Sequence, residues 1–404
     1  MTEKLKLTAN PMFVYLMVLT ICSTMGLQGW RTLFDNFSVN MVGLEGNQIG
    51  VIQSVREIPG FLALLVIFVM LLIREHRISS LSILTLGIGV GITGLFPSFF
   101  GLIGTTLVMS IGFHYFETTS QSLTLQYFDK KTSPVVFGKL RSLSAASNVA
   151  VGGMIFLLIP YLTYTQMYLV LGGIILAGGI WSLTRNPSSS DVAVQHRRMI
   201  LRRRYWLYYF LTFMAGARRQ IFVAFAVFLM VKKFDYSVQD ITILFVINNV
   251  VNYFLSPTIG RAIVRFGERK VLSIEYFSLL FIFVAYAFVD SKILVGVLYV
   301  ADHIFFNFAI AIRTFFQKIG NPSHVAPTMA VGFTINHIGA VVFPVVGGIL
   351  WMVDYRIPFI AGAGLALISL LFTQLRDRHI DRADSAVATS EALVAGAGTL
   401  PRRN

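Results

Sequence analysis

The stretch Gly260-Arg261-Ala262-Ile263-Val264-Arg265-Phe266-Gly267-Glu268-Arg269-Lys270 lies between two long apolar segments, 238–259 and 271–289. Each segment is about long enough to cross a bilayer as a helix, which takes roughly 20 residues. The two glycines allow backbone angles that other residues avoid, so the chain can turn back here. Four cations in so short a connection favour a cytoplasmic position. The stretch therefore predicts a membrane hairpin whose turn faces the cytoplasm.

Composition places the rest of the chain in the membrane as well. Of the 404 residues, 55 % are hydrophobic and 13 % are charged, whereas about a quarter of the residues in soluble domains are charged. The mean hydropathy is +0.72. Long apolar runs such as 61–73 and 279–289 lack the alternation of an outer-membrane barrel. We therefore expect an all-α polytopic protein embedded in the lipid bilayer of a cell (inner or plasma) membrane.

Twelve apolar segments are long enough to span that bilayer. They are 11–41, 46–73, 78–97, 99–128, 135–160, 164–184, 205–231, 238–259, 271–289, 292–319, 326–352 and 354–375. No small-residue cleavage site follows the first segment, so we expect it to be retained as a helix. If the N-terminus is in the cytoplasm, most of the 33 lysines and arginines fall on that side. This distribution predicts that both termini are cytoplasmic.

A polar break near the middle divides the spans six and six. We predict an N-terminal six-helix bundle at 1–184, a basic cytoplasmic linker at 185–204, a C-terminal bundle at 205–376 and a disordered cytoplasmic tail at 377–404. Short matches support two related halves, because the run 112–116 around His114 aligns with the run 301–305 around His303. Parallel repeats of this kind occur in secondary transporters.

Several classes of function are not expected. The net charge of +14 comes largely from short loops, as orientation signals do, so we predict no nucleic-acid partner. A single cysteine, Cys22, gives no disulfide framework and no thiolate metal site. No Walker-type loop occurs, so ATP is not the expected energy source. We predict no enzyme activity and no cofactor, and assign no metal-ligand set.

Ionisable side chains within spans are costly and usually face a cavity or a partner. In the first span, Arg31 and Asp35 share one helical face, either as a mutual ion pair or as a substrate or proton site. In the second span, Arg56 and Glu57 project about 100° apart, so we expect each to find its partner on another helix. These two residues are candidates for a gate or for a structural charge network.

The fourth span offers a candidate proton-handling pair. His114 and Glu117 lie three residues apart on one face and can titrate near physiological pH; the alternative is a hydrogen-bonded pair that does not titrate. Asp302, His303 and Asn307 form an opposing cluster in the tenth span.

The eleventh span adds a third imidazole, His337. Three histidines and two carboxylates in one bundle are also ligands for a transition metal. No two of these histidines are spaced to share one helical face, however. They form a metal site only if the fold brings them together.

The seventh span contains two consecutive arginines, Arg218 and Arg219. Such a pair at depth favours an anionic group on the substrate. The alternative is that Arg219 pairs with Asp302 or Glu117 and meets no substrate. Glu275, in the ninth span, is expected to pair with the cations of the 260–270 stretch.

The 260–270 stretch resembles the signature loop of the major facilitator superfamily, roughly G-x-L-x-D-R-x-G-R-[RK], which joins the second and third helices of each half. Four positions fit, and a cation follows them: Gly260, Arg265, Gly267, Arg269 and Lys270. Three positions depart from the pattern: Ala262, Val264 and Glu268. The first-half equivalent, 72–77, keeps basic residues and lacks the glycine. The resemblance thus implies the loop's place in the fold but not its usual charge latch.

This resemblance implies twelve transmembrane helices in two pseudo-symmetric six-helix bundles, with the first, fourth, seventh and tenth helices lining a cavity. It also implies a secondary transporter that works by alternating access. We predict a monomeric carrier of a small anionic or zwitterionic organic solute, coupled to protons. The rivals are an exporter of amphipathic compounds or of a metal or metal chelate, and a non-transporting membrane sensor or assembly subunit.

The candidate residues fall into three groups. Substrate binding is assigned to Arg31, Arg218, Arg219, His303, Asn307 and His337. Proton coupling is assigned to Asp35, His114, Glu117 and Asp302. Gating is assigned to Arg56, Glu57 and the signature loop.

Overall fold

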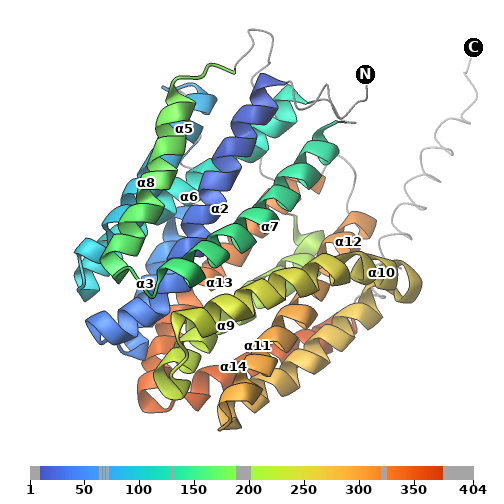
Figure 1. The fold of residues 1–404 in the computed structure, drawn as a ribbon. Coiled ribbons are helices and arrows are strands. Elements are labelled where there is room, and N and C mark those ends of the chain that lie inside the picture. Colours follow the sequence, from blue (N-terminus) through green and yellow to red (C-terminus); the bar gives the residue numbers. More distant parts are fainter. Residues whose placement is uncertain are drawn as a thin grey trace, which may run out of the picture.

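The computed structural model describes residues 10–62, 66, 69, 72–128, 132–187, 202–319 and 325–375, and these form helices joined by short connections (Figure 1). The α-helices are α2 (Pro11–Phe37), α3 (Gly46–Phe61), α5 (Glu75–Ile92), α6 (Phe99–Tyr127), α7 (Ser133–Leu158), α8 (Tyr164–Leu183), α9 (Trp206–Phe234), α10 (Val238–Phe288), α11 (Lys292–Phe306), α12 (Ile310–Ile319), α13 (Val325–Val353) and α14 (Arg356–Thr373). Within these residues, ten helices are long and apolar enough to cross a membrane. Most of the predicted linker, 185–204, and the whole predicted tail, 377–404, lie outside the described residues.

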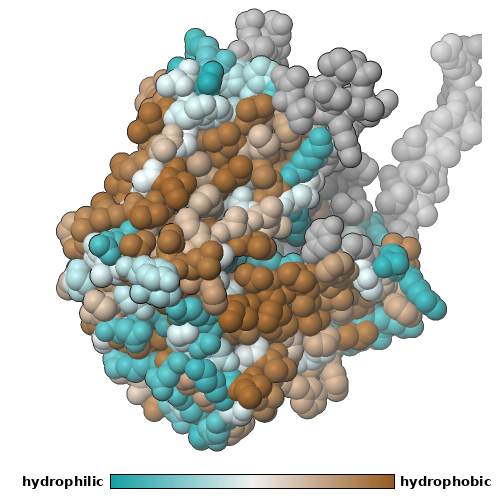
Figure 2. All heavy atoms as spheres, in the orientation of Figure 1, coloured by the Kyte–Doolittle hydropathy of each residue, from teal (hydrophilic) through white to brown (hydrophobic). Residues whose placement is uncertain are grey.

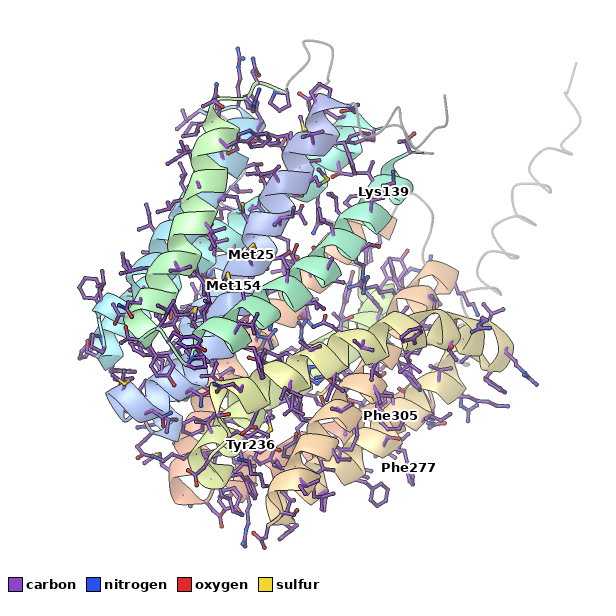
Figure 3. All side chains as sticks on the ribbon, in the orientation of Figure 1. Met25, Lys139, Met154, Tyr236, Phe277 and Phe305 are labelled. Atoms are coloured by element: carbon purple, nitrogen blue, oxygen red, sulfur yellow. The ribbon has the colours of Figure 1, made fainter. Side chains whose placement is uncertain are left out.

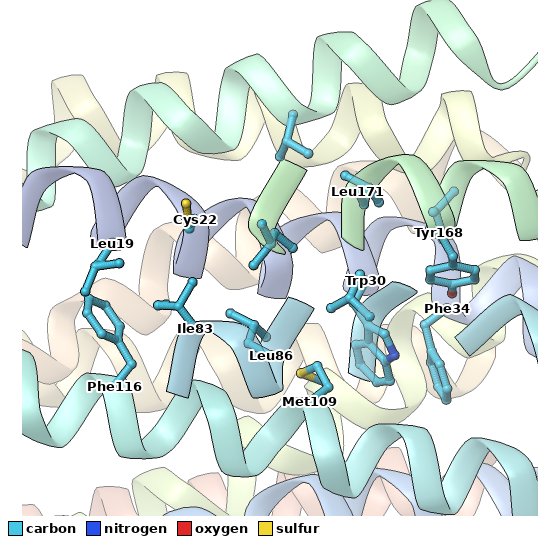
Figure 4. Close-up of a cluster of buried hydrophobic side chains, with 14 of the residues drawn as sticks. Leu19, Cys22, Trp30, Phe34, Ile83, Leu86, Met109, Phe116, Tyr168 and Leu171 are labelled. Carbon is cyan, nitrogen blue, oxygen red and sulfur yellow. The ribbon is translucent and has the colours of Figure 1, made fainter. Parts of the chain in front are cut away.

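The helices pack as two bundles, which form the two halves of Figure 1. In the first half, α2 lies against α5, α7 and α8, and its buried face includes Leu19, Trp30 and Phe34 (Figure 4). In the second half, α9 takes the corresponding place against α13 and α14. Both central helices are apolar on most of their surface, as a helix buried among others requires.

Apolar side chains also cover most of the surface visible in Figure 2, while hydrophilic ones gather at the lower end of that view. Phe277, which Figure 3 shows pointing away from the bundle, is 55 % exposed. An exposed apolar belt of this kind matches the hydrocarbon of a bilayer.

The hairpin of the 260–270 stretch is tighter than the sequence predicts. The helix continues through Gly260, and the only non-helical residue inside α10 is Gly267, with φ 79° and ψ 159°. This backbone region is essentially restricted to glycine, so one residue carries the whole reversal. Around it, Glu268 is buried and pairs with Lys318 at 2.8 Å, while Arg265, Arg269 and Lys270 are exposed.

The predicted span 292–319 is broken in its middle. Helix α11 ends at Phe306, and the 3-10 turn η5 (Asn307–Ala309) precedes α12. The Asn307 side chain donates to the backbone carbonyl of His303 at 2.6 Å and also bonds the Asn252 side chain. An asparagine that bonds the backbone in this way competes with the helical ladder, which accounts for the break.

The two halves meet at the end of the molecule that holds the loops 43–45 and 235–237, hereafter the closed end. There, Asn36 Nδ2 donates to the Tyr236 carbonyl oxygen at 2.7 Å, and Lys232 Nζ lies 2.9 Å from Glu45 Oε1. Figure 3 shows Tyr236 near this end and Lys139 of α7 near the other.

Glycines let α3 and α13 approach closely at the closed end. A Cβ on Gly46 would meet the ring of Trp351, and one on Gly50 would meet the Pro344 carbonyl oxygen. Trp351 itself stacks on Phe225, with ring centroids 5.5 Å apart. The closed end is therefore a packed contact between the halves. The charge count predicts that it faces outward, with the opposite end towards the cytoplasm.

Candidate functional site

Arg218 is built into the packing of the second half. Its guanidinium is fully buried, lies 3.4 Å from Glu275 Oε1, and stacks over the Tyr276 ring at 4.3 Å. It also donates to the Ser369 hydroxyl. Glu275 thus pairs with Arg218, and the predicted pairing of Glu275 with the cations of the 260–270 stretch is wrong. The reason is depth, because Glu275 is fully buried in the core of the half.

Arg219, one residue further along α9, points a different way. It is exposed although α9 is among the most buried spans of the chain. Among the described residues no carboxylate lies within 4.0 Å of it, so the predicted alternative of a pair with Asp302 or Glu117 is not formed. Its guanidinium approaches the Phe306 ring at 5.9 Å. Among the described residues, Arg219 is thus an accessible cation without a carboxylate partner, about halfway along a central helix.

Arg31 and Asp35 face a small polar pocket between the halves. Its walls are Trp30, Arg31, Phe34, Asp35, Gln53, Arg56, Val223, Val227 and Phe245. The pocket measures about 10 Å³, room for about one water molecule. The predicted ion pair between Arg31 and Asp35 is not formed within 4.0 Å. Arg31 approaches the Phe245 ring at 5.8 Å, and Asp35 Oδ1 is buried without a hydrogen-bond partner among the described residues.

Arg56 and Glu57 pair with each other, contrary to the expectation that each finds a partner on another helix. Arg56 Nη2 lies 2.6 Å from Glu57 Oε1, and both side chains are nearly buried. The 100° between adjacent positions does not prevent this, because the long arginine side chain curls around the helix to reach its neighbour. The other carboxylate oxygen of Glu57 faces His337 of α13, whose Nε2 is 3.8 Å away.

His114 and His337 face each other across the two halves. Their ring centroids are 5.5 Å apart, and His114 Nδ1 lies 3.7 Å from Glu117 Oε2, as the spacing of this pair predicts. The Glu117 side chain is 37 % exposed, so it is the more accessible member of this pair. The sequence places these groups on three helices, and only the packing shows that they converge.

The tenth-span cluster does not join this group. His303 Nδ1 lies 3.0 Å from the Tyr299 carbonyl oxygen, and its ring packs against Phe222. Asp302 is buried at 3 % exposure, and within the described part of the chain no cation lies within 4.0 Å of it. Of the three histidines that the sequence singles out, His114 and His337 face each other, and His303 lies apart from them.

Known proteins share this architecture. A family model described as the Major Facilitator Superfamily matches residues 12–316 and 208–401. The nucleoside transporter NupG superposes with a TM-score of 0.74 at 16 % identity, covering 90 % of this chain and 98 % of its own. A bacterial homologue of the human lysosomal transporter Spinster, in an inward-facing and occupied conformation, gives 0.70 at 14 %, covering 92 % and 97 %.

A POT family transporter in complex with a thioalcohol-conjugated peptide gives a TM-score of 0.74 at 10 % identity, covering 91 % of this chain and 96 % of its own. At such identities the likeness to solved structures shows the fold alone. The comparison with curated proteins finds no match.

Proposed function

The chain belongs to the major facilitator superfamily of secondary transporters, and from this premise we propose that it carries a small anionic or zwitterionic organic solute by alternating access, coupled to protons. The observation that supports the solute class best is that Arg219 is exposed and has no carboxylate within 4.0 Å in the part of the chain that the structure describes. Desolvating a guanidinium is costly unless an anion compensates it. A carboxylate or phosphate of the solute provides that anion with matching geometry.

The first half contributes a second cation of the same kind. Arg31 also lacks a carboxylate within 4.0 Å among the described residues, and its positive charge and that of Arg219 repel each other. The two guanidiniums belong to α2 and α9, which are central helices of opposite halves. A solute anion held between them would join the halves, as alternating access requires. We propose that His303, Asn307 and His337 contact the rest of the solute.

For coupling, we propose that protons bind at Glu117 and His114, with Asp302 and Asp35 as further carriers. Glu117 is the partly exposed member of the pair, which supports it as the entry point for the proton. Asp302 is 3 % exposed, and among the described residues no cation lies within 4.0 Å of it, so no ion pair occupies its carboxyl group. Arg218 and Glu275 then hold the second half together and take no part in binding.

The test begins with a thermal-shift screen of organic anions and zwitterions on the purified protein. A hit should stabilise the wild type, lose its effect in Arg219→Met and keep a weakened effect in Arg219→Lys. The matched control is Arg356→Gln, at an exposed arginine in the first turn of α14. Stabilisation of Arg219→Met equal to that of the wild type, or hits confined to neutral amphipathic compounds, would refute the solute class.

Coupling is tested with the confirmed solute in proteoliposomes under an imposed pH gradient. We expect Glu117→Gln and Asp302→Asn each to abolish gradient-driven uptake while exchange of internal for external solute continues. If both variants retain gradient-driven uptake, the coupling assignment fails, and Asp35→Asn is the next variant. A sensor or assembly subunit on the same scaffold would instead show neither uptake nor exchange.

A further inference from the structure

Three ligand groups for a metal ion lie together between the halves. Glu57 of α3, His114 of α6 and His337 of α13 are all buried, and each offers one ligand atom within 4.8 Å of the other two. Gly60 lies beside them, and a Cβ there would lie 2.7 Å from both His114 Cε1 and His337 Nε2. The absence of a side chain at this position leaves room for the two imidazoles to lie together.

In His337 and Glu57, one side-chain atom is held by a neighbouring group, and a second atom remains available to bind a metal. His337 Nδ1 lies 2.9 Å from the Phe333 carbonyl oxygen, which fixes the ring and directs Nε2 towards Glu57. Arg56 holds Glu57 Oε1, which leaves Oε2 facing the imidazole. Second-shell contacts of this kind orient the ligands of metal sites.

Among the described residues, His114 supplies a ring nitrogen that is not engaged in a hydrogen bond. Its Nδ1 is buried and has no hydrogen-bond partner within the described part of the chain, although buried polar atoms are nearly always hydrogen-bonded. Glu117 Oε2, at 3.7 Å from this nitrogen, is near enough to serve as a fourth ligand. Its negative charge would also offset the nearby Arg56, which otherwise opposes a bound cation.

We propose that Glu57, His114 and His337 bind a divalent transition-metal ion of the Zn²⁺ class, and that this ion joins the two halves. Two imidazoles and a carboxylate are preferred ligands for such ions. Ligand atoms about 2.0 Å from a tetrahedral ion lie about 3.3 Å from one another. The three ligand atoms lie within 4.8 Å of one another, so side-chain adjustments of about 1–2 Å would bring them to this spacing.

The position of the site determines its effect. Glu57 and His114 belong to the first half and His337 to the second, so the ion holds α13 against α3 and α6. Alternating access requires the halves to move relative to each other. A bound ion therefore holds the conformation described here, which is closed at one end, and acts as an inhibitor of the cycle.

Binding is tested by calorimetric titration of Zn²⁺ into full-length protein that carries no polyhistidine tag and has been stripped with a chelator. We expect one Zn²⁺ per chain, with affinity reduced at least about tenfold in His114→Ala and in His337→Ala, as loss of a ligand costs no less than loss of a second-shell partner. His76→Ala, at the start of α5, is the matched control. Affinity unchanged in both cluster variants would overturn the site.

A second measurement needs no variant of the ligands. X-ray absorption of the Zn²⁺-loaded wild type should show two imidazoles and carboxylate oxygen, whereas a shell of oxygen alone would overturn the assignment.

Bridging is tested by electron–electron distance measurements between spin labels at Ser142 of α7 and Val264 of α10, both exposed. Zn²⁺ should narrow this distribution in the wild type and not in His337→Ala; an unchanged wild-type distribution would refute the bridge. All these experiments omit the solute, so they do not depend on the anion proposal.

Discussion

Arg218 and Arg219 are consecutive in α9 but have opposite environments: Arg218 is fully buried beside Glu275, whereas Arg219 is exposed without a carboxylate partner within 4.0 Å among the described residues. Adjacent helical positions differ by about 100° in direction, so one side chain enters the core of the second half and the other lies on the accessible side of α9. The two arginines should therefore respond differently to the same substitution.

Arg218→Met should destabilise the protein by about 3–5 kcal/mol, because it leaves Glu275 as an uncompensated buried charge. Arg219→Met should leave the unfolding free energy nearly unchanged and remove solute binding. Chemical unfolding in detergent measures the first effect. The double variant Arg218→Met with Glu275→Gln should recover much of the loss, and equal destabilisation by the two arginine variants would contradict the assignment.

Gly50→Leu should open the closed end, because the new side chain would occupy the place of the Pro344 carbonyl oxygen. The backbone of Pro344 cannot move aside as a flexible side chain can, so α3 and α13 must separate. Spin labels at Met41 and Asp290, in a Cys22→Ser background, should report a longer distance across this end. Gly104→Leu is the control, since a Cβ at Gly104 meets nothing within 4 Å. An unchanged distance in Gly50→Leu would show that the contact is not tight.

Lys232→Ala should have little effect on that same end. The ion pair with Glu45 is short, but its side chains are 37 % and 47 % exposed, and exposed pairs contribute about 0–1 kcal/mol. Trp351→Ala removes a ring stacked on Phe225 and should lengthen the label distance as Gly50→Leu does. A larger effect from Lys232→Ala than from Trp351→Ala would mean that charge rather than packing closes this end.

Gly267→Ala should destabilise the second half by about 1–3 kcal/mol, because its backbone conformation is one that residues with a Cβ rarely adopt. The strain arises from the backbone alone, since a Cβ at Gly267 has nothing within 4 Å. Gly104→Ala should instead be neutral or stabilise by about 0.5–1 kcal/mol, as at an ordinary helical glycine. Chemical unfolding compares the two, and equal effects would rule out backbone strain at the turn.

The sequence predicted the fold class well, because the signals for it are local. Each apolar segment is long enough for a bilayer by itself, and the all-helical polytopic fold of the superfamily is confirmed. Local signals were weaker at helix interruptions: Gly267 alone makes the turn, and Asn307 breaks α11 from α12. The turn depends on the backbone angles of Gly267, and the break depends on the hydrogen bond from the Asn307 side chain to the backbone of His303.

Ion pairs between residues of the same helix were predictable in one case and not in another. The His114–Glu117 contact was predictable, since three residues along a helix bring side chains together. The Arg56–Glu57 pair was not, because helical geometry alone argues against neighbours, and the long arginine side chain overcomes it.

By itself, the sequence determined that this chain crosses a membrane many times and that ionisable groups lie within its spans. Only the tertiary structure decided which of them meet, placing His337 against Glu57 and His114 and separating Arg219 from Arg218. The physical reason is that burial in lipid is a property of each segment's composition. A contact between side chains on different helices depends instead on the rotation and depth of both helices, which are set by packing across the whole bundle.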